Sequence, residues 1–317
     1  MPVITCQERR IACGDDDVLH SLERAGIEIP SSCRTGHCQS CLAQLKQGEL
    51  TARAQRGLNE RQRALNYFLT CQYRPRDDIE IELLDTHSRR HATLVEKHVL
   101  DSRVLRVRLE AEVDWRAGQY LTLWRNTKRG RVYSIASLPA EGCIELHMRR
   151  RGGQISGWVE HQLQVGEECA ISLPRGDCYY SPAMPGQPLV LVGIGTGLSP
   201  VYGVLKQALA DGHHGEITLY ACAGEPGQLY LLRELRALDD DAGRLNIIPV
   251  VRRQAAQLDG ALQADITQLL AHNHPSLRGH LVYLCGTPAL VAHLQYQSFM
   301  QGAHHSDIFC DPFEFAQ

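Results

Sequence analysis

The sequence predicts a multidomain protein in which an α+β unit, an antiparallel β unit and an α/β unit follow one another. Residues 1–88 mix short strands, one helix and a cysteine loop. Residues 92–186 alternate apolar and polar positions in short runs, which is typical of a half-exposed antiparallel sheet. Residues 187–317 alternate apolar runs with helical stretches, which favours a parallel sheet with crossover helices. The polar stretch 83–94 indicates a linker.

Length and composition are ordinary for a globular protein of two or three domains. The chain has 317 residues, of which 44% are apolar and 22% are charged. A formal net charge of −3 offers no electrostatic argument for binding nucleic acid or a membrane. The polar amino terminus lacks the apolar core of a signal peptide, and no run approaches the roughly 18 apolar residues that span a bilayer. We therefore expect a cytoplasmic monomer without nucleic acid or membrane partners.

Four cysteines of the first unit form a pattern. The loop PSSCRTGHCQSC places three of them at the spacing C-x4-C-x2-C, and a fourth follows after 29 intervening residues, 42–70. This is the spacing of plant-type [2Fe–2S] sites, in which two irons share four thiolates. The predicted ligands are Cys33, Cys38, Cys41 and Cys71. A glycine at position 36 permits the tight turn that lets backbone N–H groups point at the cluster.

A structural zinc site and a chance grouping of cysteines are the alternatives for this loop. Zinc ligands usually come as two paired C-x2-C knuckles, and the loop holds a single pair. His37 lies between two ligand positions. Because cysteines already fill all four positions, we interpret His37 as a surface residue.

Strand patterns of the second unit cover residues 104–110, 119–124, 143–149 and 169–173, and the glycine and proline turns between them suggest a small barrel. The segment GRVYSIAS of this unit has the chemistry of a flavin site. The planar fork of Arg131 suits a pyrophosphate, Tyr133 offers an apolar ring with a polar tip, and Ser134 is able to hydrogen-bond a flavin ring nitrogen. By itself such a tetrapeptide is a weak signal that chance can produce.

Downstream of the GRVYSIAS segment, RRGGQISGWV places Gly153 and Ser156 ahead of a predicted helix, whose free N–H groups suit a phosphate. Ordinary strand and turn residues are the alternative interpretation of both segments.

The third unit carries a second phosphate-binding pattern. Its apolar runs PLVLVG, EITLYACA, NIIPVV and HLVYLCG suit strands that are buried on both faces. After the first run come Gly193, Gly195 and Gly197, which let the backbone approach a phosphate, and Pro200, which fits the first turn of a helix. The spacing G-x-G-x-G differs from the Rossmann spacing G-x-G-x-x-G, so the loop alone is a weak signal.

Two further positions of the third unit bear on the nucleotide. Cys285 and Gly286 end a buried strand, where open α/β sheets bind ligands, although a buried packing role is the alternative for the cysteine. Glu225 follows the second strand, and a carboxylate there favours a free ribose 2′-hydroxyl over a 2′-phosphate. Arg252 and Arg253, which follow the third strand, favour a 2′-phosphate instead. We expect NADH, with NADPH as the alternative.

These segments resemble known families. The cysteine loop resembles that of plant-type ferredoxins, with Gln39 where glycine is common. The ferredoxin–NADP reductase family is resembled by five segments of the second and third units: WRAGQY, RVYS, LPRGDCY, the glycine loop and YLCGTPALV. In WRAGQY, Ala117 stands where proline is usual. In this order they resemble the three-domain reductases of bacterial oxygenases over nearly the whole chain. The resemblance implies a β-grasp ferredoxin domain (1–88), a six-stranded antiparallel FAD barrel (92–186) and a parallel-sheet NAD(P)-binding domain (187–317).

The resemblance also implies roles for particular residues. It places Ser134 near flavin N5 and Cys285 near the hydride-donating carbon of the nicotinamide. The residues implied to hold FAD are Arg131, Tyr133, Ser134, Gly153, Ser156 and Phe313. The residues implied to hold the nucleotide are Gly193, Gly195, Gly197, Pro200, Glu225 and Gly286.

The expected function is an NADH-dependent oxidoreductase that passes electrons from NADH to FAD, to the [2Fe–2S] cluster and then to an oxygenase component, either a Rieske dioxygenase or a di-iron monooxygenase. The alternatives are a non-oxygenase acceptor, such as a sugar-nucleotide dehydratase, and a redox-sensing module without turnover. FMN is the alternative flavin. Residues 1–88 carry 11 basic and 13 acidic side chains, and this net charge of −2 suggests a mildly acidic docking face for the acceptor.

Overall fold

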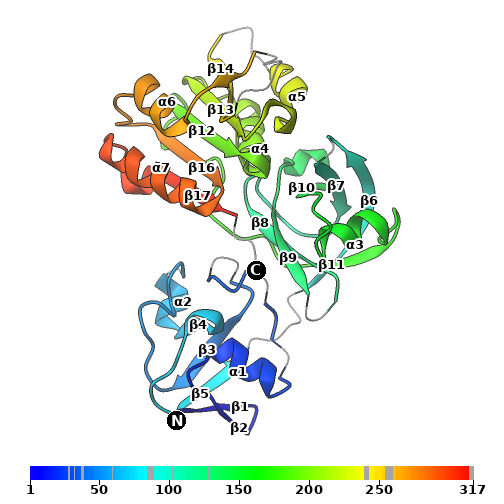
Figure 1. Cartoon of the computed structure of the whole chain (residues 1–317), viewed down its shortest axis with the longest axis vertical. Coiled ribbons are helices and arrows are strands. Elements are labelled where there is room, and N and C mark those ends of the chain that lie inside the picture. The colour runs from blue at the N-terminus through cyan, green and yellow to red at the C-terminus, as the bar shows by residue number, and fades with distance from the viewer. Residues whose placement is uncertain are drawn as a thin grey trace.

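The chain forms three sheets (Figure 1). The first two have separate hydrophobic cores, and the third has a core on each face, one of which also takes in Val104 of the second sheet. The computed structural model describes residues 1–27, 29–31, 33–36, 39–58, 60–83, 89–101, 103–126, 129–238, 243–253 and 260–313. The predicted sequence of an α+β unit, an antiparallel unit and a parallel-sheet unit is confirmed. Within the described residues, no helix combines the length and the apolar character needed to cross a bilayer.

The first unit is a five-stranded mixed sheet with the order β2-β1-β5-β3-β4. Its elements are β1 (Val3–Cys6), β2 (Arg9–Ala12), α1 (Val18–Arg24), β3 (Leu42–Gln47), α2 (Glu60–Ala64), β4 (Tyr67–Leu69), η1 (Thr70–Gln72) and β5 (Ile79–Leu83). The first strand pairs in parallel with the last, β1 with β5. Helix α1 begins where the Asp17 carboxylate accepts from His20 N at 2.8 Å, and it buries Val18, Leu19 and Leu22 in the core.

The second unit is a six-stranded antiparallel sheet with the order β10-β7-β6-β11-β8-β9. Its elements are β6 (Arg90–Val99), β7 (Val104–Glu110), β8 (Tyr120–Trp124), β9 (Gly130–Ser134), η3 (Pro139–Glu141), β10 (Ile144–Arg149), α3 (Ser156–His161) and β11 (Glu168–Ile171). An isolated bridge between Ile135 and Leu146 joins the end of β9 to β10. This bridge brings the two edges of the sheet together, so the sheet curls into the predicted barrel.

The predicted linker 83–94 is wrong at both ends. Leu83 belongs to β5, and β6 begins at Arg90. Ala92 and Leu94 face the barrel core, at 2% and 0% exposure. Thr93 between them lies on the opposite face of the strand, and this alternation is that of a strand with one buried face. Residues 84–88 lie outside the described part of the chain.

The third unit is a six-stranded sheet with the order β15-β14-β13-β12-β16-β17, and all of its pairs are parallel. Its elements are β12 (Leu189–Ile194), η4 (Gly195–Gly197), α4 (Leu198–Ala210), β13 (Ile217–Ala223), η5 (Pro226–Gln228), α5 (Leu232–Arg236), β14 (Leu245–Val251), β15 (Leu262–Gln263), α6 (Ile266–Asn273), β16 (Leu281–Gly286), α7 (Pro288–Met300), η6 (His305–Asp307) and β17 (Ile308–Pro312). The strand order reverses next to β12, and open sheets bind ligands at such a point.

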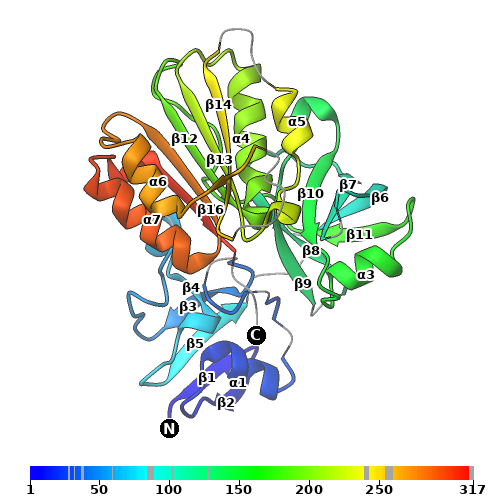
Figure 2. The same ribbon diagram turned by 45° about the horizontal axis from the view of Figure 1, so that its top comes forward.

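The barrel and the parallel-sheet unit lie side by side, with the first unit below both (Figures 1 and 2). Among the residues that the structure describes, two hydrogen bonds join the first unit to the barrel. Ser40 Oγ lies 3.3 Å from Thr122 Oγ1, and Arg175 Nη1 donates to Gln39 O at 3.4 Å. The loop that carries the predicted cluster ligands therefore lies against the barrel.

Candidate functional site

The cysteine loop has the features of a cluster site. Cys33, Cys41 and Cys71 are buried, whereas Cys38 and His37 lie outside the described residues. The backbone N–H of Thr35 donates to Cys33 Sγ at 3.4 Å. The hydrogen bond from Cys41 lowers the pKa of the Cys71 thiol despite its burial, which favours the thiolate that iron needs. These residues fit a [2Fe–2S] cluster.

Left-handed backbone shapes this loop at three positions. Arg34, Gly36 and Gln39 have φ of +57°, +89° and +53°. A Cβ on Gly36 would lie 2.8 Å from Gln72 Cγ, so both the backbone and the space there require glycine. Gln39 holds its positive φ where related ferredoxins commonly have glycine, and its side chain makes hydrogen bonds that a glycine lacks.

The flavin segment lies on β9, which pairs with β8. Arg131 and Tyr133 share one face of the strand and are half-buried, whereas Ser134 is buried on the other. Burial raises the pKa of the Tyr133 hydroxyl, which therefore remains protonated. Ser156 begins α3, and its Oγ would lie 3.3 Å from a Cβ on Gly153, so the loop and the helix start are in close contact. An arginine whose planar fork suits a pyrophosphate and a helix start without a side-chain cap, both on one barrel, fit FAD.

A buried hydrogen bond joins the flavin segment to the nucleotide sheet. Ser134 Oγ donates to Asp311 Oδ2 at 2.6 Å, and Ser199 Oγ of α4 donates to Ser134 O at 3.3 Å. Asp311 is 3% exposed and stands beside Cys285 in the pairing of β17 with β16. Gly193 stands beside Cys285 on its other side, in β12. The nucleotide loop, the predicted reactive cysteine and the flavin serine thus meet at the carboxyl ends of three strands.

Sequence reasoning missed Asp311, because a single acid in the tail segment IFCDP carries no local signal. The sequence patterns also gave no role to Cys178. The structure places Cys178 Sγ 3.5 Å from Cys285 Sγ. Burial raises the pKa of Cys285, so this thiol is neutral.

The glycines of the nucleotide loop differ in what surrounds them. A Cβ on Gly197 would lie 2.2 Å from Cys285 O, and one on Gly193 would lie 2.7 Å from Leu198 Cα. These two glycines let β12, α4 and β16 approach closely. Gly195 has φ +59° and no atom within 4 Å of its Cβ position, so it faces open space where a phosphate can approach.

The remaining nucleotide candidates lie around this loop. Pro200 is buried in the first turn of α4. Gly286 has φ +139°, and its carbonyl accepts from Phe313 N at 2.6 Å, which fixes the backbone of the predicted flavin-packing residue beside the β16 end. Glu225 and Arg253, which argued for opposite nucleotides, form an exposed ion pair at 3.8 Å.

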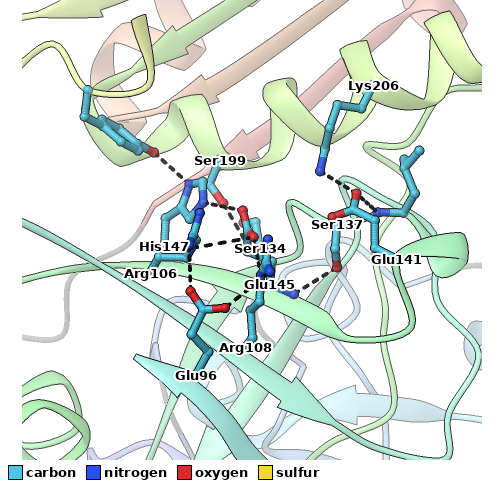
Figure 3. A network of polar contacts seen from close by, with 12 residues as sticks. Glu96, Arg106, Arg108, Ser134, Ser137, Glu141, Glu145, His147, Ser199 and Lys206 are labelled. Atoms are coloured by element: carbon cyan, nitrogen blue, oxygen red, sulfur yellow. Dashed lines mark hydrogen bonds and ion pairs between the residues drawn. The ribbon is translucent and has the colours of Figure 1, made fainter. Parts of the chain in front are cut away.

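A buried polar network between the barrel and α4 was also missed by sequence reasoning (Figure 3). Glu145 of β10 accepts from Arg108 Nε and contacts His147 Nε2, both at 2.9 Å. His147 Nδ1 lies 3.2 Å from the hydroxyl of Tyr230, which follows β13. Burial by itself raises the pKa of the Glu145 carboxyl. The contacts with His147 and Arg108 lower this pKa by more, so that it falls to about 2. The network fastens the barrel to the loop that follows Glu225.

Known families match all three units in the same order. The chain matches the 2Fe-2S iron-sulfur cluster binding domain over residues 3–76, the oxidoreductase FAD-binding domain over 91–180 and the oxidoreductase NAD-binding domain over 191–295. The chain is 31% identical to the ferredoxin–NAD(P)+ reductase component of the naphthalene 1,2-dioxygenase/salicylate 5-hydroxylase systems of Ralstonia sp., over 92% of each chain. It belongs to the three-domain oxygenase reductases.

Other relatives agree with this assignment. The reductase is 30% identical to the naphthalene 1,2-dioxygenase system reductase component of Pseudomonas putida, over 94% of this chain and 93% of that protein. The crystal structure of the Amycolatopsis cytochrome P450 reductase GcoB superposes with a TM-score of 0.69 at 28% identity, covering 99% of both chains. The reductase is therefore an NAD(P)H oxidoreductase that binds a [2Fe–2S] cluster, FAD and NAD(H).

Proposed function

We propose that the reductase takes hydride from NADH and delivers single electrons to the oxygenase component of a multicomponent system, a Rieske dioxygenase or a di-iron monooxygenase. When bound, FAD supplies the step between a two-electron donor and a one-electron cluster. The observation that carries the proposal is the position of the barrel, which contacts the cluster loop through Ser40 and Gln39 and the nucleotide sheet through Ser134. Relatives over nearly the full length are named as reductase components of oxygenase systems.

Within the barrel, we propose that Arg131 and Tyr133 hold FAD and that Gly153 and Ser156 bind its pyrophosphate. Ser134 contacts the flavin ring near N5. The Ser134 proton is committed to the buried Asp311 carboxylate, so the lone pairs of its oxygen are left to accept a hydrogen bond. Asp311 is a positioning residue in this proposal, since it acts through the serine.

At the sheet edge, we propose that Gly195 faces the nucleotide phosphates and that Cys285 stands by the nicotinamide as a neutral thiol, which adds no charge beside the hydride path. Phe313 packs against the flavin. Glu225 selects NADH because its carboxylate accepts a free ribose 2′-hydroxyl and repels a 2′-phosphate.

We further propose the domain bounds 1–88, 92–186 and 187–317, and a monomer that works in the cytoplasm. Cores that lie separately within residues 4–83 and within the barrel support the division between the first two domains.

Changing Cys71→Ser tests the order of the carriers. Flavin reduction by NADH is expected to keep its rate, because Cys71 lies in the ferredoxin domain, whereas reduction of a one-electron protein acceptor stops. Stopped-flow absorbance measures the first and steady-state cytochrome c reduction measures the second. Cys143→Ser, in the barrel and half-buried, is the matched control and keeps both activities. Loss of flavin reduction in Cys71→Ser, or undiminished cytochrome reduction, would contradict the proposal.

A further inference from the structure

The ferredoxin domain carries a basic segment, residues 51–66, whose charge is opposite to that of the rest of the domain. The segment TARAQRGLNERQRALN has four arginines and one glutamate, a net charge of +3. The other residues of 1–88 carry seven basic and twelve acidic side chains, a net charge of −5. The net charge of −2 therefore averages two regions of opposite sign.

The arginines of this segment are available to a partner. Arg53, Arg56 and Arg63 are exposed, and among the described residues no ion pair engages any of them. Four of the seven basic side chains elsewhere in the domain have acidic partners among the described residues. These pairs are Arg10–Asp78, Arg24–Asp16, Arg34–Glu23 and Lys46–Glu82.

Hydrogen bonds fasten the basic segment to the cluster loop. Gln39 Nε2 donates to Gly57 O at 2.9 Å, and Gln62 Nε2 donates to Gln39 Oε1 at 3.4 Å. Arg53 Nε donates at 3.4 Å to Gln72 Oε1, next to the ligand Cys71. The charged segment therefore borders the cluster site on two sides, at the loop and at the fourth ligand.

The barrel does not use these arginines. Between the described residues of the barrel and of the domain, the hydrogen bonds involve Ser40 Oγ and Gln39 O, and none joins Arg53, Arg56 or Arg63 to the barrel. Figure 1 shows α2, which lies inside the segment, at the edge of the ferredoxin domain away from β8 and β9. One border of the cluster loop thus faces the electron source, and a different, basic border is left exposed.

We propose that the basic segment 51–66 docks the protein that receives the electron, and that this partner presents a ring of carboxylates around its own redox centre. The inference rests on the proposed function, since it needs a protein acceptor. Opposite charges steer two such surfaces together and raise the association rate, which salt then lowers. The acceptor is accordingly expected to bind to a positively charged surface, although the net charge of the domain is negative.

Two haem proteins of opposite charge serve as probes, acidic cytochrome b5 and basic cytochrome c. The fully loaded reductase is compared with Arg53→Glu/Arg56→Glu/Arg63→Glu and with a control of equal charge change, Arg9→Glu/Arg10→Glu/Arg76→Glu, whose exposed arginines lie on or near β2 and ahead of β5. Stopped flow gives the second-order rate constant for each probe at low and at high salt. NADH-driven bleaching of flavin and cluster without a probe is recorded for every protein.

The wild type is expected to reduce cytochrome b5 about tenfold more slowly at high salt than at low salt. At low salt the second-order rate constant of the segment variant is about tenfold lower than that of the wild type with cytochrome b5 and higher with cytochrome c. The control variant has rate constants close to those of the wild type. The milder variant Arg53→Gln/Arg56→Gln/Arg63→Gln replaces the charge-reversal variant if that protein does not fold. Its rate constant with cytochrome b5 is expected to fall by a smaller factor.

Equal rates with cytochrome b5 in the wild type and the segment variants, or an equal loss in the control, would overturn the docking proposal while leaving the proposed function standing. Absence of cluster bleaching by NADH in the wild type would instead overturn the proposed function itself.

Discussion

Glu145 is charged and buried where the barrel meets the nucleotide domain, and changing it to glutamine tests what that charge contributes. Its pKa lies at about 2, against an ordinary value of 4.5. At about 1.4 kcal/mol per pH unit, this difference corresponds to roughly 3 kcal/mol of stability. Because the folded-state pKa is the lower one, the contribution is complete above about pH 4.5 and is lost as the pH falls through 2.

Denaturant unfolding at pH 7 and pH 3 provides the assay, with released-flavin fluorescence reporting on the barrel. Glu145→Gln is expected to be less stable than the wild type by about 3 kcal/mol at pH 7 and by about 1.5 kcal/mol at pH 3. The exposed Glu110→Gln, on the neighbouring strand β7, is the control and should cost under about 0.5 kcal/mol. A loss that is equal at both pH values, or equally large in Glu110→Gln, would refute the reasoning.

Three further changes probe the flavin and nucleotide residues. Asp311→Ala should slow flavin reduction by NADH about 10- to 100-fold in stopped flow, with NADH affinity little changed, because the Ser134 hydroxyl loses the group that orients it; an unchanged rate would exclude the positioning role. Gly197→Ala should abolish NADH turnover, since its methyl would lie 2.2 Å from the Cys285 carbonyl oxygen, whereas Gly195→Ala should lower stability by only about 1–2 kcal/mol. Thermal melts and KM values for NADH that show the larger damage in Gly195→Ala would contradict this prediction. Glu225→Gln should raise kcat/KM for NADPH relative to NADH, and an unchanged ratio would remove the carboxylate from the basis of selectivity.

Local patterns in the sequence were enough to predict the three units and their order. The C-x4-C-x2-C loop and the buried apolar runs carry their chemistry within a few residues, and the structure has buried cysteines and parallel strands at those places. Helix α5 is short and runs only from Leu232 to Arg236, because Leu231 at its start adopts φ +62°. A single left-handed residue without glycine gives no warning in the sequence.

The contacts that join the units could not be predicted, because they link distant parts of the chain. Ser134 and Asp311 are 177 residues apart, and only the pairing of β17 with β16 brings the acid to the flavin segment. His147 and Tyr230 are 83 residues apart, and each looks like an ordinary strand or loop residue in isolation. Burial makes these polar pairs strong, but burial itself follows from the complete fold.

The pairing of β1 with β5 bears on how the protein is made. The sheet of the ferredoxin domain closes as soon as residue 83 is available, and its core draws only on residues 4–83. Amino-terminal domains generally fold as units during synthesis. All four cysteines precede the closing strand, so iron is able to enter a finished domain before the ribosome has completed the barrel. Cells starved of iron and cells starved of riboflavin should accordingly accumulate different partial forms of the protein, each lacking one cofactor while retaining the other.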